Sequence, residues 1–345
     1  MTWVTWRLYR LPGAIALALL AAFAAVELTT GLRMASAWHH LLATCGDSGT
    51  MEGDGTCDGG SVIGVLGNDM RVLSISVPLI IGVLLGAPLA AHEMETGTTR
   101  FTWTQGITRS RWLLVKAGWL LLAAAICAGA VSALVTFWSG PVNAMRGDQF
   151  SGAFFDTQGV APVGYAVFAT ALGIAAGALL RRTLPAIAVT IAGFAGIRLL
   201  IVDAVRPHLM PAVTSITGLV QGPTSPGITW FLSSGIIGPS GQPLSLVKDG
   251  VGVGVDGLPI PLSAMPAACQ KLAPAAITAG PPAKGAPDPV AALTSCLSHA
   301  GFRQSITYQP GWRYWPFQGI EAGIYLLLAA ALVAVAWYAI RRRDA

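Results

Sequence analysis

Charge is scarce in this chain. Asp, Glu, Lys and Arg make up 11% of its 345 residues, whereas soluble globular domains carry about 25%. Hydrophobic residues account for 54%. So few polar side chains cannot cover a folded surface in water, which excludes a soluble globular protein and indicates a polytopic membrane protein.

Several functional signatures are also missing. The sequence has no GxxxxGK[ST] phosphate loop, so the chain does not bind ATP by that mechanism. Its His39-His40 pair and the adjacent His92 and Glu93 lack metal-ligand spacing, so we expect neither a metal site nor catalytic residues. The net charge of +5 is explained by basic residues at membrane edges and predicts no nucleic-acid partner.

Long apolar runs are abundant instead. A membrane-spanning helix needs about 20 apolar residues, and these runs are continuous rather than alternating, which favours helices over barrel strands. We therefore predict an all-α protein with six transmembrane helices. They are Gly13–Leu32, Val72–Ala91, Leu113–Trp138, Ala161–Leu180, Leu184–Asp203 and Ile320–Ile340.

Basic residues orient these spans, since they gather on the cytoplasmic side of a membrane. They lie before the first span, around the loop after the second, between the fourth and fifth, and after the sixth; the loop 34–71 is acidic. Both termini are therefore predicted to be cytoplasmic. The chain fits the bacterial plasma membrane as a multi-pass protein.

Residues 1–12 interleave Trp and Tyr with Arg, a composition that suits an interfacial helix. A cleaved signal peptide is the alternative interpretation. It is disfavoured because the apolar run is long and Glu27 falls beside any plausible cleavage point.

Residues 205–319 form the predicted extracellular segment and contain sixteen of the 22 prolines. Proline breaks helices, so long regular elements are not expected here. The apolar stretch Ile228–Ile237 is too short to span; it is either a re-entrant or interfacial helix or the core of a small outer subdomain. Four cysteines on this oxidising side allow three pairings, and local bridges Cys45–Cys57 and Cys269–Cys296 are favoured because short loops close easily.

Several charged residues lie inside predicted spans. Lys116 is near the start of its span, and Asp203 and Glu321 lie near the outer interface and are interpreted as boundary residues, which leaves Glu27 and Arg198. Counted at about 1.5 Å per residue from the basic anchors, Glu27 and Arg198 reach similar depths in the outer third of the bundle. Charges in hydrocarbon tend to face the interior and pair, which predicts a Glu27–Arg198 ion pair. The alternative is that each side chain reaches separately toward the outer headgroups.

The loop after the second span is the most polar part of the chain between two spans. Residues 92–112 carry two glutamates and three arginines: Glu93, Glu95, Arg100, Arg109 and Arg111. A compact charged loop on the cytoplasmic side can form ion pairs with a partner protein. The alternative is a basic loop that only anchors the topology, but such an anchor does not need the two glutamates.

The order of elements resembles the membrane subunit of type-2 ABC exporters, and the loop resembles the actinobacterial form of these permeases. The recurring strings are E-x-E-x-G-T at Glu93–Thr98, T-Q at Thr104–Gln105 and T-R-x-R-W at Thr108–Trp112. The Pro-rich outer segment departs from the better-known members, so their substrates cannot be transferred.

The resemblance implies a permease that forms a homodimer or heterodimer and packs against a cytoplasmic ABC ATPase. ATP and magnesium would be bound by that partner, with no cofactor on this chain, and the five charged loop residues would contact the ATPase. Two other classes stay open: a membrane enzyme acting on a lipid-linked substrate, and a non-transporting anchor or immunity protein.

Overall fold

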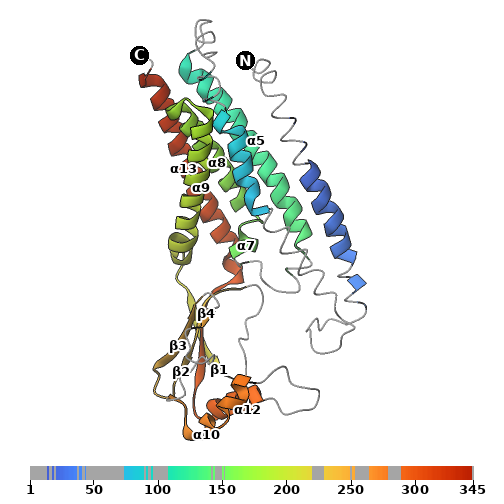
Figure 1. Cartoon of the computed structure of the whole chain (residues 1–345), viewed down its shortest axis with the longest axis vertical. Coiled ribbons are helices and arrows are strands. Elements are labelled where there is room, and N and C mark those ends of the chain that lie inside the picture. Colours follow the sequence, from blue (N-terminus) through green and yellow to red (C-terminus); the bar gives the residue numbers. More distant parts are fainter. Residues whose placement is uncertain are drawn as a thin grey trace. The chain divides into compact units, whose positions relative to one another are not determined.

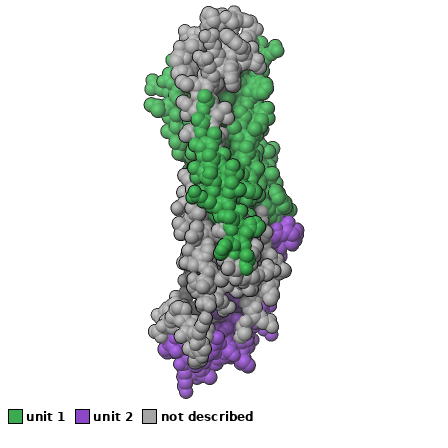
Figure 2. Space-filling model, turned by 90° about the vertical axis from the view of Figure 1, so that its right-hand side faces the viewer, with its two compact units in different colours: residues 1–209, 314–345 green, residues 210–313 purple. Residues whose placement is uncertain are grey.

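The computed structural model describes residues 21–36, 74–88, 108–140, 152–219, 229–248, 251–252, 264–278 and 289–343, with a few single positions between them. Most of these residues are helical. The chain divides into two compact units: unit 1 comprises Met1–Leu209 and Tyr314–Ala345, and unit 2 comprises Met210–Arg313 (Figures 1 and 2).

Four helices of the described chain are long and apolar enough to cross a membrane. They are α5 (Arg109–Trp138), α8 (Ala161–Leu180), α9 (Thr183–Leu200) and α13 (Tyr314–Arg343) (Figure 1). A π-helical turn η1 (Ile201–Val205) and a 3₁₀ turn η2 (Arg206–His208) continue α9, and a short helix α7 (Gly152–Phe155) precedes α8. These helices contain the last four predicted spans.

The first two predicted spans are described in part. Residues 21–36 are helical, as are residues 74–85, where the apolar helix is shorter than a membrane span. The interfacial helix predicted for residues 1–12 lies outside the described residues.

Helix α8 forms the core of unit 1 and packs against α5, α9 and α13. It begins with Pro162 in its first turn and ends at Arg181, whose left-handed backbone (φ 55°) turns the chain directly into α9. Sixteen of its residues are buried. Alanine and glycine dominate these positions, which allows neighbouring helices to approach closely.

One of these close approaches joins α8 to the helix at residues 74–88. Gly82 and Gly86 on that helix and Gly173 and Gly177 on α8 both have the GxxxG spacing. A Cβ added at Gly86 would lie 2.4 Å from the carbonyl oxygen of Thr170, and one at Gly173 would lie 2.6 Å from a backbone nitrogen of the facing helix. Only glycine fits these positions, so this helix pair is held by backbone-to-backbone contact.

Helix α13 carries aromatic residues near both ends. Trp315 is exposed near the start, and Trp337 and Tyr338 lie near the end beneath Arg341 and Arg342, whose guanidinium carbons are 5.2 and 4.8 Å from their ring centroids. From Trp315 to Trp337 the helix rises about 33 Å, close to the roughly 30 Å hydrocarbon core of a bilayer. Aromatic belts of this kind mark membrane interfaces.

Unit 2 contains a five-stranded antiparallel sheet with strand order β1-β5-β2-β3-β4. In its central strands Ile306 of β5 pairs with Ser215 of β1 and Ser234 of β2. Three helices accompany the sheet. The elements are β1 (Val213–Gly218), β2 (Thr229–Ile237), β3 (Pro243–Lys248), β4 (Val251–Gly252), α10 (Ala267–Gln270), α11 (Ala273–Thr278), α12 (Pro289–His299) and β5 (Arg303–Pro310).

This sheet corrects the all-α prediction. The stretch Ile228–Ile237 contributes strand β2 rather than a re-entrant or interfacial helix. The prolines do not prevent regular structure because several lie at element ends: Pro243 begins β3, Pro289 begins α12 and Pro310 ends β5. Proline is tolerated at the first residue of a strand or helix.

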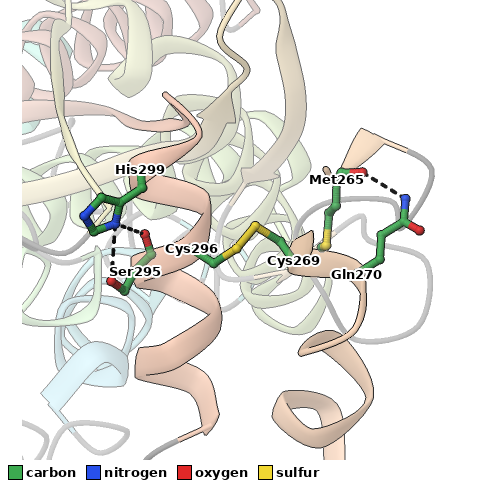
Figure 3. Close-up of a disulfide and its surroundings, with 6 residues drawn as sticks. All are labelled: Met265, Cys269, Gln270, Ser295, Cys296 and His299. Carbon is green, nitrogen blue, oxygen red and sulfur yellow. Dashed lines mark hydrogen bonds between the residues drawn. A yellow bond between two sulfur atoms is a disulfide. The ribbon is translucent and has the colours of Figure 1, made fainter. Parts of the chain in front are cut away.

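A disulfide between Cys269 and Cys296 joins α10 to α12, as the local pairing predicted (Figure 3). It lies in an apolar cluster that includes Leu293, Leu297 and Phe302. Cys45 and Cys57 lie outside the described residues, so their pairing stays a prediction.

Candidate functional site

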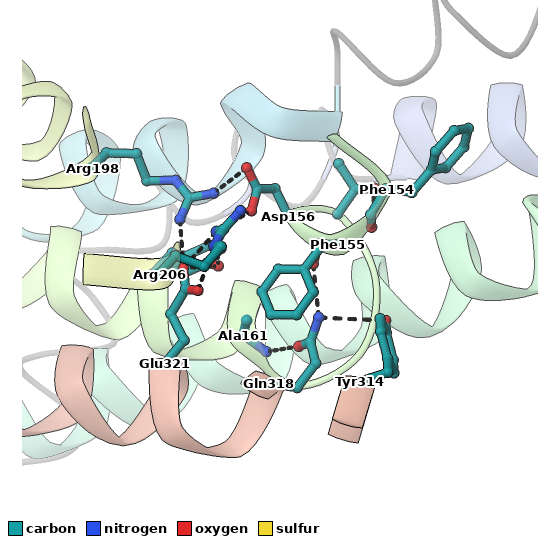
Figure 4. A network of polar contacts seen from close by, with 11 residues as sticks. Phe154, Phe155, Asp156, Ala161, Arg198, Arg206, Tyr314, Gln318 and Glu321 are labelled. Carbon is teal, nitrogen blue, oxygen red and sulfur yellow. Dashed lines mark hydrogen bonds and ion pairs between the residues drawn. The ribbon is translucent and has the colours of Figure 1, made fainter. Parts of the chain in front are cut away.

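Unit 1 holds a largely buried group of five polar side chains, here called the charge cluster: Asp156, Tyr165, Arg198, Arg206 and Glu321. Figure 4 shows its four charged members. Arg206 contacts Glu321 twice, through Nε to Oε2 at 2.8 Å and Nη2 to Oε1 at 2.7 Å. The same Nη2 reaches Asp156 Oδ1. Arg198 donates to Asp156 Oδ2 at 2.6 Å and to Glu321 Oε1 at 3.1 Å. Both guanidinium groups therefore contact both carboxylates.

The charge cluster draws on four parts of unit 1. Asp156 immediately follows α7, Tyr165 lies in the second turn of α8, and Glu321 lies in the third turn of α13. Arg198 is in the last turn of α9 and Arg206 begins η2, with the π-helical η1 between them. π-Helical turns inside helices occur frequently at functional sites.

The cluster balances two positive and two negative charges in a dry environment. Glu321 is 0% exposed and Arg206 2%, while Arg198 and Asp156 are 13% exposed. The Tyr165 hydroxyl donates to Glu321 Oε1 at 2.7 Å. Removing such charges from water is costly, and the cost is offset here by full pairing within the cluster.

Aromatic rings give both guanidinium groups a second kind of contact. The guanidinium carbon of Arg198 is 3.8 Å from the ring centroid of Tyr165, and that of Arg206 is 4.5 Å from the Phe155 ring. Cation–π contacts are strongest where the cation is desolvated. The rings therefore stabilise the buried arginines from the sides that carboxylates do not reach.

Gln318, one turn before Glu321, fastens α13 to the α7–α8 connection (Figure 4). Its Oε1 accepts a hydrogen bond from the Ala161 backbone N–H at 2.7 Å, and its Nε2 donates to the Phe155 carbonyl at 2.8 Å. Gly159, in the same connection, has a φ of 75°, and a Cβ there would lie 2.9 Å from the Gln318 amide. This neutral network holds the backbone around Asp156 in place.

The structure does not bring Glu27 and Arg198 together. Arg198 contacts Asp156 and Glu321, whereas the buried Glu27 accepts a hydrogen bond of 3.5 Å from Ser74 Oγ. The predicted pair fails because equal depth does not make two helices neighbours. The helix of Glu27 packs beside α5, where the Trp138 indole N–H donates to Thr30 Oγ1.

The charged loop is described only in part. Glu93 and Arg100 lie outside the described residues, and Arg109 is the first residue of α5, with its side chain not described. Arg111 is exposed in the first turn of α5. The carboxylate of Glu95 accepts hydrogen bonds from both Thr183 Oγ1 at 2.8 Å and the Thr183 backbone N–H at 3.2 Å.

Glu95 therefore binds the first residue of α9. A carboxylate at a helix N-terminus pairs with free N–H groups and the positive end of the helix dipole. The other end of the same helix carries Arg198 of the charge cluster. From Thr183 to Arg198 the helix rises about 22 Å, so a single rigid element connects the charged loop to the charge cluster.

Among the described residues, no group of three or more His, Cys, Asp or Glu side chains could hold a metal ion.

The apolar helices, the aromatic belts of α13 and the buried charge cluster define a multi-pass helical membrane protein.

Residues 17–206, more than half of the chain, match the family described as ABC-2 membrane transporter related. The chain belongs to this family, and the predicted type-2 ABC permease class is confirmed. No curated protein and no solved structure matches the chain.

The sequence singles out Arg198 and Glu95 but not the partners of Arg198. The interpretation of Glu321 as a boundary residue is wrong, because this carboxylate is fully buried and contacts both arginines. Asp156 and Arg206 lie just outside the predicted spans, where charged residues are ordinary. Glu321 was the one available signal, because a carboxylate inside a span is expensive without a partner.

Proposed function

We propose that this chain is the membrane-spanning permease subunit of an ABC exporter in the bacterial plasma membrane. A separate cytoplasmic ATPase hydrolyses ATP with magnesium, and the permease, as a homodimer or heterodimer, converts that work into export of a small molecule, lipid or peptide. The chain itself needs neither a cofactor nor catalytic residues for this task. Membership of the ABC-2 membrane transporter related family supports this proposal.

The proposed topology has six spans with both termini in the cytoplasm and residues 205–319 outside. Contact between Glu321, early in α13, and Arg198, late in α9, implies that these helices run antiparallel. The start of α9 and the end of α13 then share one end of unit 1. Arg181 and Arg182 flank the first, and Arg341–Arg343 form the second, which favours the cytoplasm for this end.

The observation that carries the coupling role is the pair of hydrogen bonds between Glu95 and Thr183. In the proposed topology Glu95 lies on the cytoplasmic side, in the loop that would contact the ATPase. Movement of this loop during ATP binding would act directly on the cytoplasmic end of α9. The helix would carry that displacement across the membrane to Arg198.

The test measures ATP hydrolysis by the permease co-purified with its proposed cytoplasmic ABC ATPase. Glu95→Ala removes both hydrogen bonds to Thr183 and with them the direct contact between this loop and the start of α9. We expect permease-dependent ATP hydrolysis to fall by about tenfold or more, and Glu95→Gln, which retains one acceptor, to fall less.

Asp203→Asn provides the matched control. Asp203 is an exposed carboxylate at the opposite end of the same membrane helix, and its substitution should leave hydrolysis unchanged. The proposal fails if the ATPase does not co-purify, or if Glu95→Ala and Asp203→Asn give the same hydrolysis rate. Lipid modification by the purified chain without any ATPase would instead support a membrane enzyme.

A further inference from the structure

We infer that the charge cluster is a latch that holds the extracellular end of the helix bundle closed and opens during each transport cycle. This inference rests on the proposed function for its orientation and its driving force. It assigns a conformational role to side chains that contact one another across four separate elements.

The contacts of the cluster are suited to repeated breaking and remaking. Asp156, Arg198, Arg206 and Glu321 bridge the α7–α8 connection, α9, η2 and α13 through side chains alone. Separating the two arginines from the two carboxylates breaks side-chain contacts only, and the hydrogen bonds of Gln318 to the Ala161 N–H and the Phe155 carbonyl are kept. Closely packed interfaces with discrete partners tend to have two stable arrangements rather than a continuum.

The charge balance supplies a second stable arrangement. In the closed form, the pairing of the four charges offsets the free-energy cost of removing them from water. Glu321 lies about 9 Å along α13 from Trp315 in the aromatic belt, so water from the extracellular side can reach the separated groups. Hydration then replaces pairing in the open form.

The backbone around the cluster divides into a rigid side and a side that can move. On the rigid side, α8 meets the helix at 74–88 through glycine contacts as close as Gly86 to Thr170, which leave no room to slide. On the other side, η1 interrupts α9 with a π-helical turn between Arg198 and Arg206. Helix α13 also stays with α8, because Gln318 bonds the Ala161 N–H and the Phe155 carbonyl and because Gly164 lies close to the Ala322 backbone. We therefore expect α9 and η2 to move away from α8 and α13.

Cysteine accessibility tests the latch. Ala161 is fully buried at the start of α8, one turn before Tyr165, and Ala176 is buried on α8 away from the cluster, with 4% of its surface exposed. Each is replaced singly by cysteine in a background carrying Cys127→Ala, and labelling by N-ethylmaleimide is followed in lipid nanodiscs. The background without an introduced cysteine is subtracted.

We expect Glu321→Gln to raise the labelling rate of Ala161→Cys by about tenfold or more, which is the factor equivalent to 1.4 kcal/mol. The rate of Ala176→Cys should stay within about twofold of its starting value. Tyr165→Phe removes the hydroxyl's hydrogen bonds with Glu321 and Arg206 but retains the ring and all four charges, so it should give a smaller rise at Ala161→Cys. It also serves as the test if Glu321→Gln does not fold.

Two results would overturn the latch. One is an unchanged Ala161→Cys rate in both folded variants; the other is an equal rise at Ala161→Cys and Ala176→Cys, which would indicate general loosening. A second arm adds the co-purified ATPase and ATP to the native cluster and should accelerate labelling at Ala161→Cys. Acceleration by Glu321→Gln but not by ATP would support the latch and contradict the proposed function.

Discussion

The charge balance of the cluster predicts a specific pattern of stability. Arg206→Met leaves Asp156 and Glu321 facing a single arginine, with a net buried charge of −1. Glu321→Leu leaves two arginines facing Asp156, with a net charge of +1. Breaking a buried ion pair from one side costs about 3–5 kcal/mol, so each substitution alone should destabilise unit 1 by that amount.

The double variant should cost far less than the sum. If the two effects were independent, the double variant would lose about 6–10 kcal/mol. Instead it returns the cluster to zero net charge and keeps the 2.6 Å contact between Arg198 and Asp156. We expect its cost not to exceed that of either single variant, which corresponds to a coupling energy of at least about 3 kcal/mol.

The measurement is the free energy of unfolding in mixed micelles with increasing dodecyl sulfate, for the native chain and the three variants. A second cycle pairs Arg206→Met with Arg342→Met at the far end of α13, where we expect no coupling. Additive costs for Arg206→Met and Glu321→Leu would refute the reasoning. They would mean that the side chains contribute packing rather than charge balance.

Three further predictions concern other contacts. Gly86→Leu should cost about 1–3 kcal/mol through overpacking, measured in the same unfolding assay, whereas Gly118→Leu, with open space around its Cβ position, should be nearly neutral. Replacing both Cys269 and Cys296 by serine should destabilise unit 2 by about 2–4 kcal/mol, seen as faster proteolysis of unit 2 in the intact protein. Gln318→Leu leaves buried backbone partners unsatisfied at about 1–3 kcal/mol and should lower the thermal unfolding temperature.

The four membrane-length helices that the structure describes in unit 1 could be predicted closely from the sequence. The run Ala161–Leu180 coincides with α8. Its start is indicated by Pro162, which favours the first turn of a helix, and its end by the charged pair Arg181 and Arg182. The apolar length required by a bilayer fixes such elements without knowledge of their neighbours.

The sheet of unit 2 and the partners of Arg198 could not be predicted in this way. The high proline content of residues 205–319 predicts little regular structure. Strands and helices form there nevertheless, because prolines such as Pro243 and Pro289 lie at the ends of elements. The contacts of Arg198 depend on which helices lie side by side. Depth, which the sequence does provide, is one coordinate of three, so it placed Glu27 and Arg198 at one level without making them neighbours.

The burial of α8 has a consequence for the order in which the protein is assembled. Helix α13 covers α8 and brings Glu321 to Arg198 and Arg206, yet it is synthesised after the whole of unit 2, residues 210–313. Until α13 is made, Arg198 and Arg206 can pair with Asp156 but not with Glu321. Helix α13 thus completes the charge cluster, and a chain truncated before Tyr314 should be degraded faster in the cell than the chain that includes α13.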